Sequence, residues 1–433
     1  MKKPVPFFFL IAALPLAAQE LLTLSEEQAV ALALEASPRL REAQALAQAS
    51  QGAVLQAQAR LQPRLTITAN AERRNPVPEF RLPQELGGKV LYPSIETTGR
   101  LNATLSRNLD LAGTLAHLQA VAVQRRTAQE MRVLQVRQEV ALQARMAFWQ
   151  ALAATATAEV AEKDLERAQQ TLADTETLRE VGLTADPELL TARAELERAR
   201  VSLGTARGQV HLALVSLRSL LGLAVEQAVA LQKPSQLPPA PPPLEDLLLQ
   251  GRAQRPELQA LQLQLEALQR QVAAERAGGK PTLSLAASYQ WEQPNSRFFP
   301  LQERWRGSWW IGAAATWSPW DGGELAGRVA QAQGEVEAAR AQLREAQRQV
   351  DLEVTKARQR VVDALALLPA TAAAVEAAKA REEAVREGFR VGIASLSDVV
   401  DAQTALARAE GAWVQSQIAA WEAQAYLLWS VGR

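Results

Sequence analysis

The chain contains the same order of motifs twice, and this duplication constrains its fold more than any other feature. Ser37-Pro38-Arg39-Leu40 is matched 218 positions later by Arg255-Pro256-Glu257-Leu258. The short motif Val181-Gly182-Leu183 is matched 210 positions later by Val391-Gly392-Ile393. Self-similarity over such a distance indicates two copies of one structural unit. We therefore predict two similar halves, residues 19–232 and 244–433.

The halves are joined by residues 233–243, six of which are proline. Such a composition predicts a stiff, extended linker, and a proline-binding partner motif is the alternative. At the N-terminus, Met1-Lys2-Lys3 precedes a short apolar run that ends at Ala17-Ala18. This pattern is typical of a secretory signal peptide, which we predict over residues 1–18. The alternative, a membrane anchor, requires a run of about twice this length.

Four segments carry apolar residues three or four positions apart, which predicts amphipathic helices. Their approximate bounds are 113–181, 184–222, 324–390 and 394–430. Alanine dominates the apolar stripes, so neighbouring backbones can approach closely, as in a coiled coil. Pro369 is expected to kink or split the third of these helices, because proline removes a backbone donor and clashes with the preceding turn.

Four shorter segments alternate apolar and polar residues, which predicts strands with one face of each kind. Their approximate bounds are 64–74, 97–109, 282–292 and 307–318, close to the roughly 9–11 residues of a membrane-spanning strand. Six of the ten tryptophans fall between Trp291 and Trp320. Tryptophan at strand ends is typical of a membrane interface, whereas the alternative is a soluble hairpin packed on a helix. The predicted interface residues are Trp291, Trp305, Trp309, Trp317 and Trp320.

Several classes of function are disfavoured by composition. The formal net charge is +0, so no basic surface for nucleic acid is implied. The chain has no cysteine, which excludes thiolate metal sites. Its two histidines, His117 and His211, lie in helical pattern without a catalytic serine or carboxylate arrangement nearby in the sequence. We predict no enzymatic activity, no cofactor and no metal site.

Two kinds of motif carry a family resemblance. Glycine-containing turns follow each pair of strands, at Asp110-Leu111-Ala112-Gly113 and at Trp320-Asp321-Gly322-Gly323. The stretch from Phe389 to Ala402 is similar to a Gly-x-x-x-x-x-Asp-Val-Leu-Asp-Ala signature. In this order, and duplicated, these motifs resemble the TolC family of outer-membrane efflux proteins across essentially the whole mature chain.

The resemblance implies a homotrimer, in which each chain gives four strands to a shared barrel of twelve strands among outer-membrane lipids. The long helices would form a tunnel across the periplasm. The partners would be a periplasmic adaptor and an inner-membrane pump of the RND, ABC or MFS type. The implied function is a passive exit duct for efflux or type I secretion. The alternatives are a periplasmic coiled-coil adaptor or scaffold without a barrel, and a secreted enzyme.

The family also implies a constricted entrance at the helix tips, formed around Gly182, Gly392 and Phe389. Asp398 and Asp401 match the acidic positions of that entrance, and Glu188 is the corresponding acid of the first half. Without the resemblance, these acids read as ordinary residues at helix starts, stabilised by the helix dipole. The type member of the family has tyrosine and arginine where this chain has Phe389 and Ala394, and those two groups latch its closed entrance.

Overall fold

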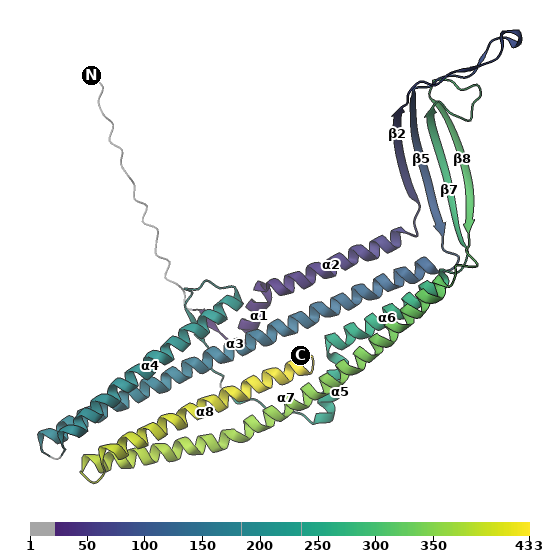
Figure 1. The fold of residues 1–433 in the computed structure, drawn as a ribbon. Coiled ribbons are helices and arrows are strands. Elements are labelled where there is room, and N and C mark those ends of the chain that lie inside the picture. Colours follow the sequence, from purple (N-terminus) through teal and green to yellow (C-terminus); the bar gives the residue numbers. More distant parts are fainter. Residues whose placement is uncertain (1–21, 183, 235) are drawn as a thin grey trace, which may run out of the picture. The chain divides into compact units, whose positions relative to one another are not determined.

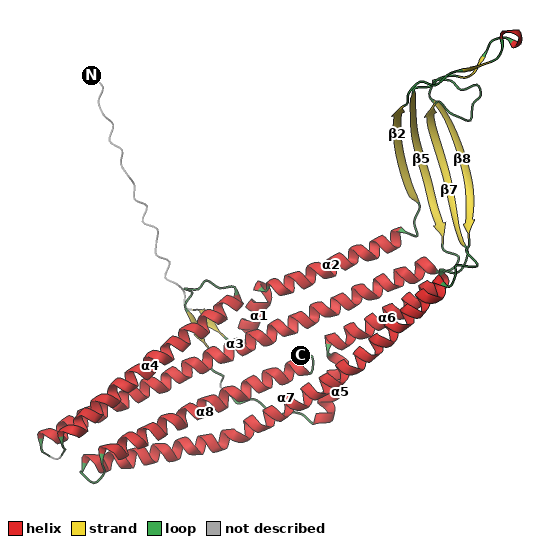
Figure 2. Ribbon diagram, in the orientation of Figure 1, coloured by secondary structure: helices red, strands yellow, loops and turns green. Residues whose placement is uncertain are grey.

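The structure, a computed structural model, describes residues 22–182, 184–234 and 236–433. The predicted signal peptide, residues 1–18, lies outside the described residues. The described chain is mainly helical and includes one four-stranded sheet (Figure 2). The order of two helices, two strands and two long helices occurs twice along the chain. The labels in Figure 1 let the reader follow both copies. The expected fold class, mainly α with a smaller β part, is confirmed.

The first copy contains α1 (Glu26–Ala36), α2 (Pro38–Ala59), β2 (Arg64–Arg73), β5 (Thr97–Leu109), α3 (Thr114–Glu180) and α4 (Asp186–Leu221). The second copy contains α5 (Leu244–Gln254), α6 (Pro256–Ala277), β7 (Thr282–Gln293), β8 (Arg306–Thr316), α7 (Glu324–Arg390) and α8 (Leu396–Ser430). Two small strand pairs are also present. Strands β1 (Leu22–Leu24) and β6 (Val229–Leu231) pair in parallel, and β3 (Phe80–Arg81) and β4 (Val90–Tyr92) pair antiparallel. A 3-10 turn at Gln84–Leu86 lies between β3 and β4.

The chain forms two compact units, and each unit draws on both copies of the repeat. The helical unit comprises the described residues up to Leu40, Val136–Gln254 and Asp351–Arg433. The sheet unit comprises Arg41–Gln135 and Arg255–Val350. The repeat and the compact units differ because α3 and α7, each 67 residues long, contribute to both units.

One core cluster of the helical unit joins β1 and α1 to α3 and α4. Leu24, Ala29, Phe148 and Leu217 are all buried there. Alanine on α1 allows the end of α4 to approach very closely, since a Cβ added at Gly222 would lie 2.7 Å from Ala36 Cβ. Gly222 also has a φ of +67°, so glycine is required here both for space and for backbone conformation.

Helix α7 passes through Pro369 without interruption. Of the two effects expected of this proline, a kink or a split, the split is therefore wrong. Its neighbour α8 explains why the local cost is tolerated. Ala364 and Leu368 pack against Ala420 of α8. Two residues after the proline, Thr371 Oγ1 lies 3.0 Å from the Leu367 carbonyl oxygen and 2.9 Å from Ser416 Oγ of α8. Tertiary packing therefore keeps the helical path where sequence alone predicts a break.

The sheet unit contains an antiparallel sheet of order β2-β5-β7-β8 (Figure 1). Its register aligns side chains of one kind on one face. Apolar partners oppose each other in the cross-strand pairs Leu65↔Leu105, Leu101↔Trp291, Ala103↔Tyr289, Ala287↔Ile311 and Tyr289↔Trp309. Because side chains alternate along a strand, the opposite face is polar. There Thr104 Oγ1 lies 3.0 Å from Ser288 Oγ, and Arg100 pairs with Glu292 at 2.6 Å.

The apolar face of this sheet is uncovered, and the sheet does not close on itself. Ile67, Trp309 and Ile311 are 65%, 69% and 75% exposed. Among the described residues, β2 and β8 each pair on one side only, so both edges carry unpaired backbone groups. Exposed apolar faces and open edges both require a cover, which the described residues of this chain do not supply.

Candidate functional site

Two tight turns connect the long helices within the helical unit, one between α3 and α4 and one between α7 and α8. The amide N–H of Gly182 donates to the Arg179 carbonyl, and that of Gly392 donates to the Phe389 carbonyl, both at 3.0 Å. Their φ angles are +78° and +76°, in the left-handed region that favours glycine. The two predicted turn glycines therefore occupy equivalent positions in the two copies.

Asp398 lies at the third position of α8 and completes a capping box. Its Oδ2 accepts from the Ser395 hydroxyl at 2.6 Å and from the Ser395 amide at 3.0 Å, while the Asp398 amide donates back to Ser395 Oγ. These two hydrogen bonds hold the pKa of Asp398 below its usual value, and the bond from the hydroxyl has the larger effect. The structure thus gives Asp398 a role at the helix start, and its side chain is also exposed.

The two other predicted acids, Glu188 and Asp401, lie near the starts of α4 and α8. Glu188 is the third residue of α4, as Asp398 is of α8, and its carboxylate accepts from the Thr184 hydroxyl. Asp401 follows Asp398 by three positions on α8 and is exposed. Residues three apart lie on the same face of a helix, so Asp398 and Asp401 form one acidic edge beside the turn.

Phe389, predicted at the entrance, is 4% exposed and packs inside the helical unit. Its cluster includes Ala192 of α4 and Leu396 and Val399 of α8, with Leu172 of α3 packed against it. The ring therefore fixes the α7–α8 turn against the α3–α4 hairpin. The exposed apolar side chains near the turns are instead Val181, Val391 and Ile393, at 65%, 60% and 85%.

Polar contacts between the two hairpins were not predicted from the sequence. Arg390 of α7 pairs with Asp174 of α3 at 3.1 Å. Arg167 of α3 pairs with Glu410 of α8 at 3.0 Å, and both side chains are largely buried, at 14% and 20% exposure. These partners are separated by 216 and 243 positions, so no local pattern in the sequence indicates them.

A buried hydrogen bond joins the same two hairpins. The Gln403 side-chain amide of α8 donates to Thr171 Oγ1 of α3 at 2.8 Å. Near it, burial raises the pKa of Asp164, although the neighbouring Arg167 acts in the opposite direction. The hairpins are thus connected by an apolar cluster, two ion pairs and a buried amide.

In the sheet unit, the five predicted tryptophans fall into two groups. Trp291 and Trp309 lie near the β7–β8 connection, where the Trp305 ring packs against Trp291 with centroids 5.0 Å apart and planes inclined by 44°. Trp317 and Trp320 follow the other end of β8. The eight residue steps from Trp309 to Trp317 correspond to roughly 26 Å along a strand at ~3.3 Å per residue. Strands of membrane barrels are tilted by about 35–45°, so this length would correspond to roughly 20 Å of barrel height, of the same order as the ~25 Å apolar band between the aromatic girdles.

Within the described residues, no group of three or more His, Cys, Asp or Glu side chains is placed to hold a metal ion. The features present are a sheet with an apolar face and open edges, paired long helices, and acids beside the turns. Together they define the class of outer-membrane channel subunits with long helical extensions. The chain belongs to the outer membrane efflux protein family, whose model matches residues 29–223 and 247–433.

Individual relatives agree with this assignment. The chain is 26% identical over 238 residues to the outer membrane protein TolC of Escherichia coli strain K12. That match covers 53% of this chain and 48% of TolC, so the chain spans about half the length of this curated relative. The resemblance to the TolC family is confirmed.

Solved structures share the fold. The CmeC outer membrane channel of Campylobacter jejuni superposes with a TM-score of 0.79 at 18% identity, covering 94% of this chain and 85% of CmeC. The outer membrane protein VceC of Vibrio cholerae superposes with a TM-score of 0.78 at 21% identity, covering 94% of this chain and 96% of VceC. The duplicated helices and sheet are thus an arrangement seen in known outer-membrane channels.

Proposed function

We propose that this chain is a subunit of a passive outer-membrane exit duct. The observation that carries the proposal is the four-stranded sheet, which has one apolar and one polar face and continues into paired long helices. In lipid, every backbone group must be satisfied within the protein, so a sheet can cross only as part of a closed barrel. A periplasmic scaffold has no use for an exposed apolar sheet face with tryptophans near both ends.

The duct is a homotrimer in this proposal. Four strands are too few to close a barrel, so β2 of one chain pairs with β8 of the next. Helix α7 supports association as well. It contains an 18-residue stretch of mean hydropathy 1.6, long and apolar enough to cross a membrane, of which only 17% is buried. Neighbouring chains would cover this stretch. Twelve strands from three chains would then form one barrel.

Membrane assembly should depend on which face of β8 is changed. Arginine in place of Ile311 puts a charge on the lipid face, at a cost of about 2–4 kcal/mol per chain near the bilayer centre. We expect Ile311→Arg to reduce recovery from the outer-membrane fraction several-fold. Ala314→Arg, on the polar face of the same strand, should leave recovery near the wild-type level. Cell fractionation and mass measurement of the purified assembly would check both points.

Wild-type protein recovered from the soluble periplasmic fraction, or a purified mass other than three chains, would contradict the duct. Equal recovery of the two variants would show that neither face of β8 is specifically in contact with lipid.

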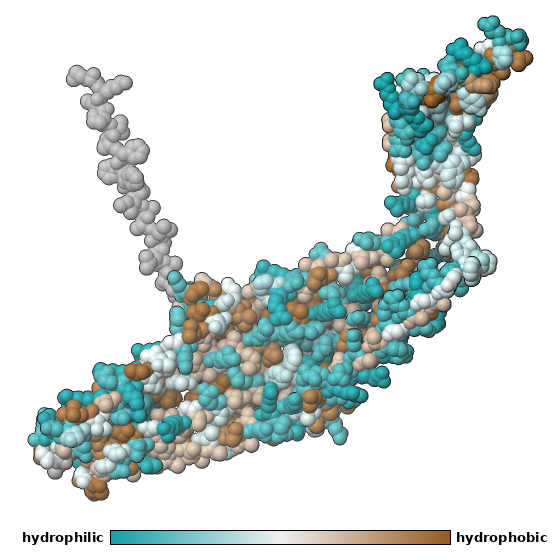
Figure 3. Space-filling view, in the orientation of Figure 1, coloured by the Kyte–Doolittle hydropathy of each residue, from teal (hydrophilic) through white to brown (hydrophobic). Residues whose placement is uncertain are grey.

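The proposed partners are a periplasmic adaptor and an inner-membrane pump, which supplies the energy for export. The exposed turns offer a docking surface for the adaptor, because Val181, Val391 and Ile393 are apolar and uncovered. Apolar side chains are visible on the surface at the turn ends of the hairpins (Figure 3). Co-purification of the intact complex would identify the pump as RND, ABC or MFS type.

Charges on the turns should block adaptor docking without unfolding the duct. We expect Val391→Asp with Ile393→Asp to lower export in cells at least tenfold, while the trimer still reaches the outer membrane. Val225→Asp, at a similarly exposed apolar residue after α4, serves as the control. Crosslinking to the adaptor and export of a reporter substrate would be measured. Normal export by the double variant would remove the turns from the docking surface.

Opening of the entrance is proposed to be a relative movement of the two hairpins, biased by partner binding. This chain lacks the family's tyrosine and arginine latch, since Phe389 and Ala394 occupy those positions. The Arg390–Asp174 and Arg167–Glu410 pairs connect the same two hairpins and would take over this restraint.

A further inference from the structure

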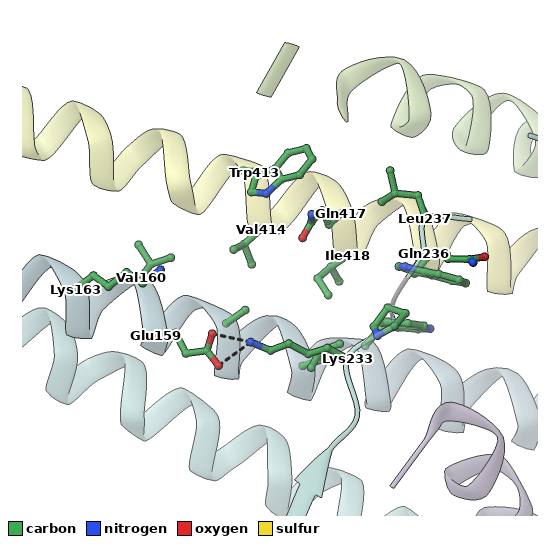
Figure 4. A pocket seen from close by; sticks show the side chains of 15 residues that line it. Glu159, Val160, Lys163, Lys233, Gln236, Leu237, Trp413, Val414, Gln417 and Ile418 are labelled. Atoms are coloured by element: carbon green, nitrogen blue, oxygen red, sulfur yellow. Dashed lines mark hydrogen bonds and ion pairs between the residues drawn. The ribbon is translucent and has the colours of Figure 1, made fainter. Parts of the chain in front are cut away.

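The helical unit contains a cavity of about 350 Å³ that the duct function does not use. It lies between α3, α8 and the described residues of the Pro-rich linker (Figure 4). Small-molecule sites typically occupy clefts of about 300–1,000 Å³. The cavity is therefore large enough for an organic molecule of one or two rings.

The cavity has an apolar, aromatic wall. Trp149 of α3 and Trp421 of α8 stack in parallel, with ring centroids 5.0 Å apart and planes inclined by 10°. Trp149 is 2% exposed, which anchors the pair in the core of the unit. Trp413 and Ile418 of α8 line the same space. Since flat indole walls hold flat rings or short alkyl chains well, the wall favours an apolar ligand body.

The rim of the cavity carries an excess of positive charge. Lys233 of the linker donates to both carboxylate oxygens of Glu159 on α3, at 2.6 and 2.8 Å (Figure 4). Lys163, one helical turn beyond Glu159, also lines the cavity and is exposed. Among the described residues, the Lys163 ammonium has no ion-pair partner, and Glu159 is already engaged by Lys233.

We propose that this cavity binds an amphiphilic organic anion, with its apolar body against the tryptophans and its carboxylate or sulfonate at Lys163. A cationic ligand is disfavoured because Glu159, the one carboxylate among the described residues that line the cavity, is neutralised by Lys233. A bound ligand would touch α3, α8 and the linker together. It would therefore hold the linker, which joins the two copies of the repeat, against both helices.

The proposal is tested with 2-naphthoate as the probe and the full trimer in lipid nanodiscs. Isothermal titration calorimetry would be performed on the protein and on empty nanodiscs, whose heats are subtracted. We expect saturable binding of one naphthoate per chain. Neutral 2-naphthalenemethanol should bind at least fivefold more weakly, because it shares the ring system and lacks the charge.

Two variants and one control locate the site. Lys163→Ala should weaken naphthoate binding about tenfold, whereas Lys356→Ala, which removes an exposed lysine of α7 outside the cavity, should leave it unchanged. Ala156→Trp should abolish binding by filling the cavity, since Ala156 lines it.

The proposal would be overturned by absence of saturable binding to the wild type. Equal affinity for the neutral analogue, or unchanged affinity in Lys163→Ala and Ala156→Trp, would overturn it as well. Export activity plays no part in this readout, so failure of the duct proposal would be seen separately in the fractionation experiment.

Discussion

Replacing Asp398 and Asp401 together with asparagine is expected to remove most of the channel's preference for cations. In a trimer, three copies of this acidic edge would place six carboxylates around one entrance. Rings of carboxylates of this kind select cations by attracting them and repelling anions. Asparagine keeps an acceptor oxygen for the Ser395 hydroxyl and amide, so the start of α8 is retained while the charge is lost. Reversal potentials in planar bilayers under a salt gradient would measure the change.

The two halves of the repeat provide a control for this experiment. Glu188→Gln removes one acid per chain at the equivalent position of α4, and a smaller loss of selectivity is expected. An unchanged reversal potential in Asp398→Asn with Asp401→Asn would show that these acids do not line the pore and serve only at the helix start.

The lowered pKa of Asp398 adds a test of pH dependence. A depressed pKa means that the carboxylate stays ionised to a lower pH than an ordinary aspartate with a pKa of 3.8. The contribution of Asp398 to stability and to cation selectivity is therefore present at neutral pH and is lost only as the pH falls through the depressed value. In Ser395→Ala, which removes the first of the two donors, both contributions should be lost at a higher pH.

Removing Arg167 and Arg390 together is expected to open the entrance without any partner. Arg390–Asp174 is a partly exposed pair, so solvent screens it and its contribution is expected to be small. Arg167 is more deeply buried. Losing it leaves Glu410 without an ion-pair partner among the described residues, while Asp164 keeps the charge of Arg198 nearby. The cost of leaving such a group unpaired is roughly 1–3 kcal/mol. Because 1.4 kcal/mol is about a tenfold change in an equilibrium, we expect an increase in open probability of ten-fold or more.

Single-channel recording of Arg167→Ala with Arg390→Ala would measure this increase. Arg200→Ala is a suitable control, because Arg200 is an exposed arginine of α4 that pairs with Glu197 within its own helix. Burial raises the pKa of Asp164, so its protonation on acidification begins above the ordinary value of 3.8. Repulsion between Asp164 and Glu410 should then weaken, and low pH should partly close the double variant. A conductance that matches the wild type at every pH would contradict the restraint.

Local patterns predicted the elements of this fold well. The alternation through Leu283, Leu285 and Ala287 indicated a strand with two unlike faces, and that strand is present as β7. The glycines of the Val-Gly motifs indicated turns, because glycine readily adopts a positive φ. The predicted split at Pro369 was wrong because the energetic cost of proline is local to its helical turn. The packing of α7 on α8 that offsets this cost involves residues about 50 positions away.

At the candidate site, too, the sequence predicted positions along the helices but not the contacts of the side chains. The sequence placed Asp398 at a helix start, and the structure adds its donors, Ser395 hydroxyl and amide, which depress its pKa. Phe389 stands beside the turn in the sequence, yet its side chain is buried against α3 and α4. Its direction could not be predicted, since it depends on the packing of two hairpins separated by about 200 residues.

The sequence by itself determined the duplication, the alternation of the strands, the length of the helices and the glycine turns. These features follow from backbone conformation and side-chain periodicity, which act over a few residues. Only the tertiary structure decided the sheet order β2-β5-β7-β8, the pairing of Arg390 with Asp174 and of Arg167 with Glu410, and the cavity beneath the linker. Each of these features brings together residues that are far apart in the chain. Such contacts depend on the packing of the whole unit, so no local sequence pattern predicts them.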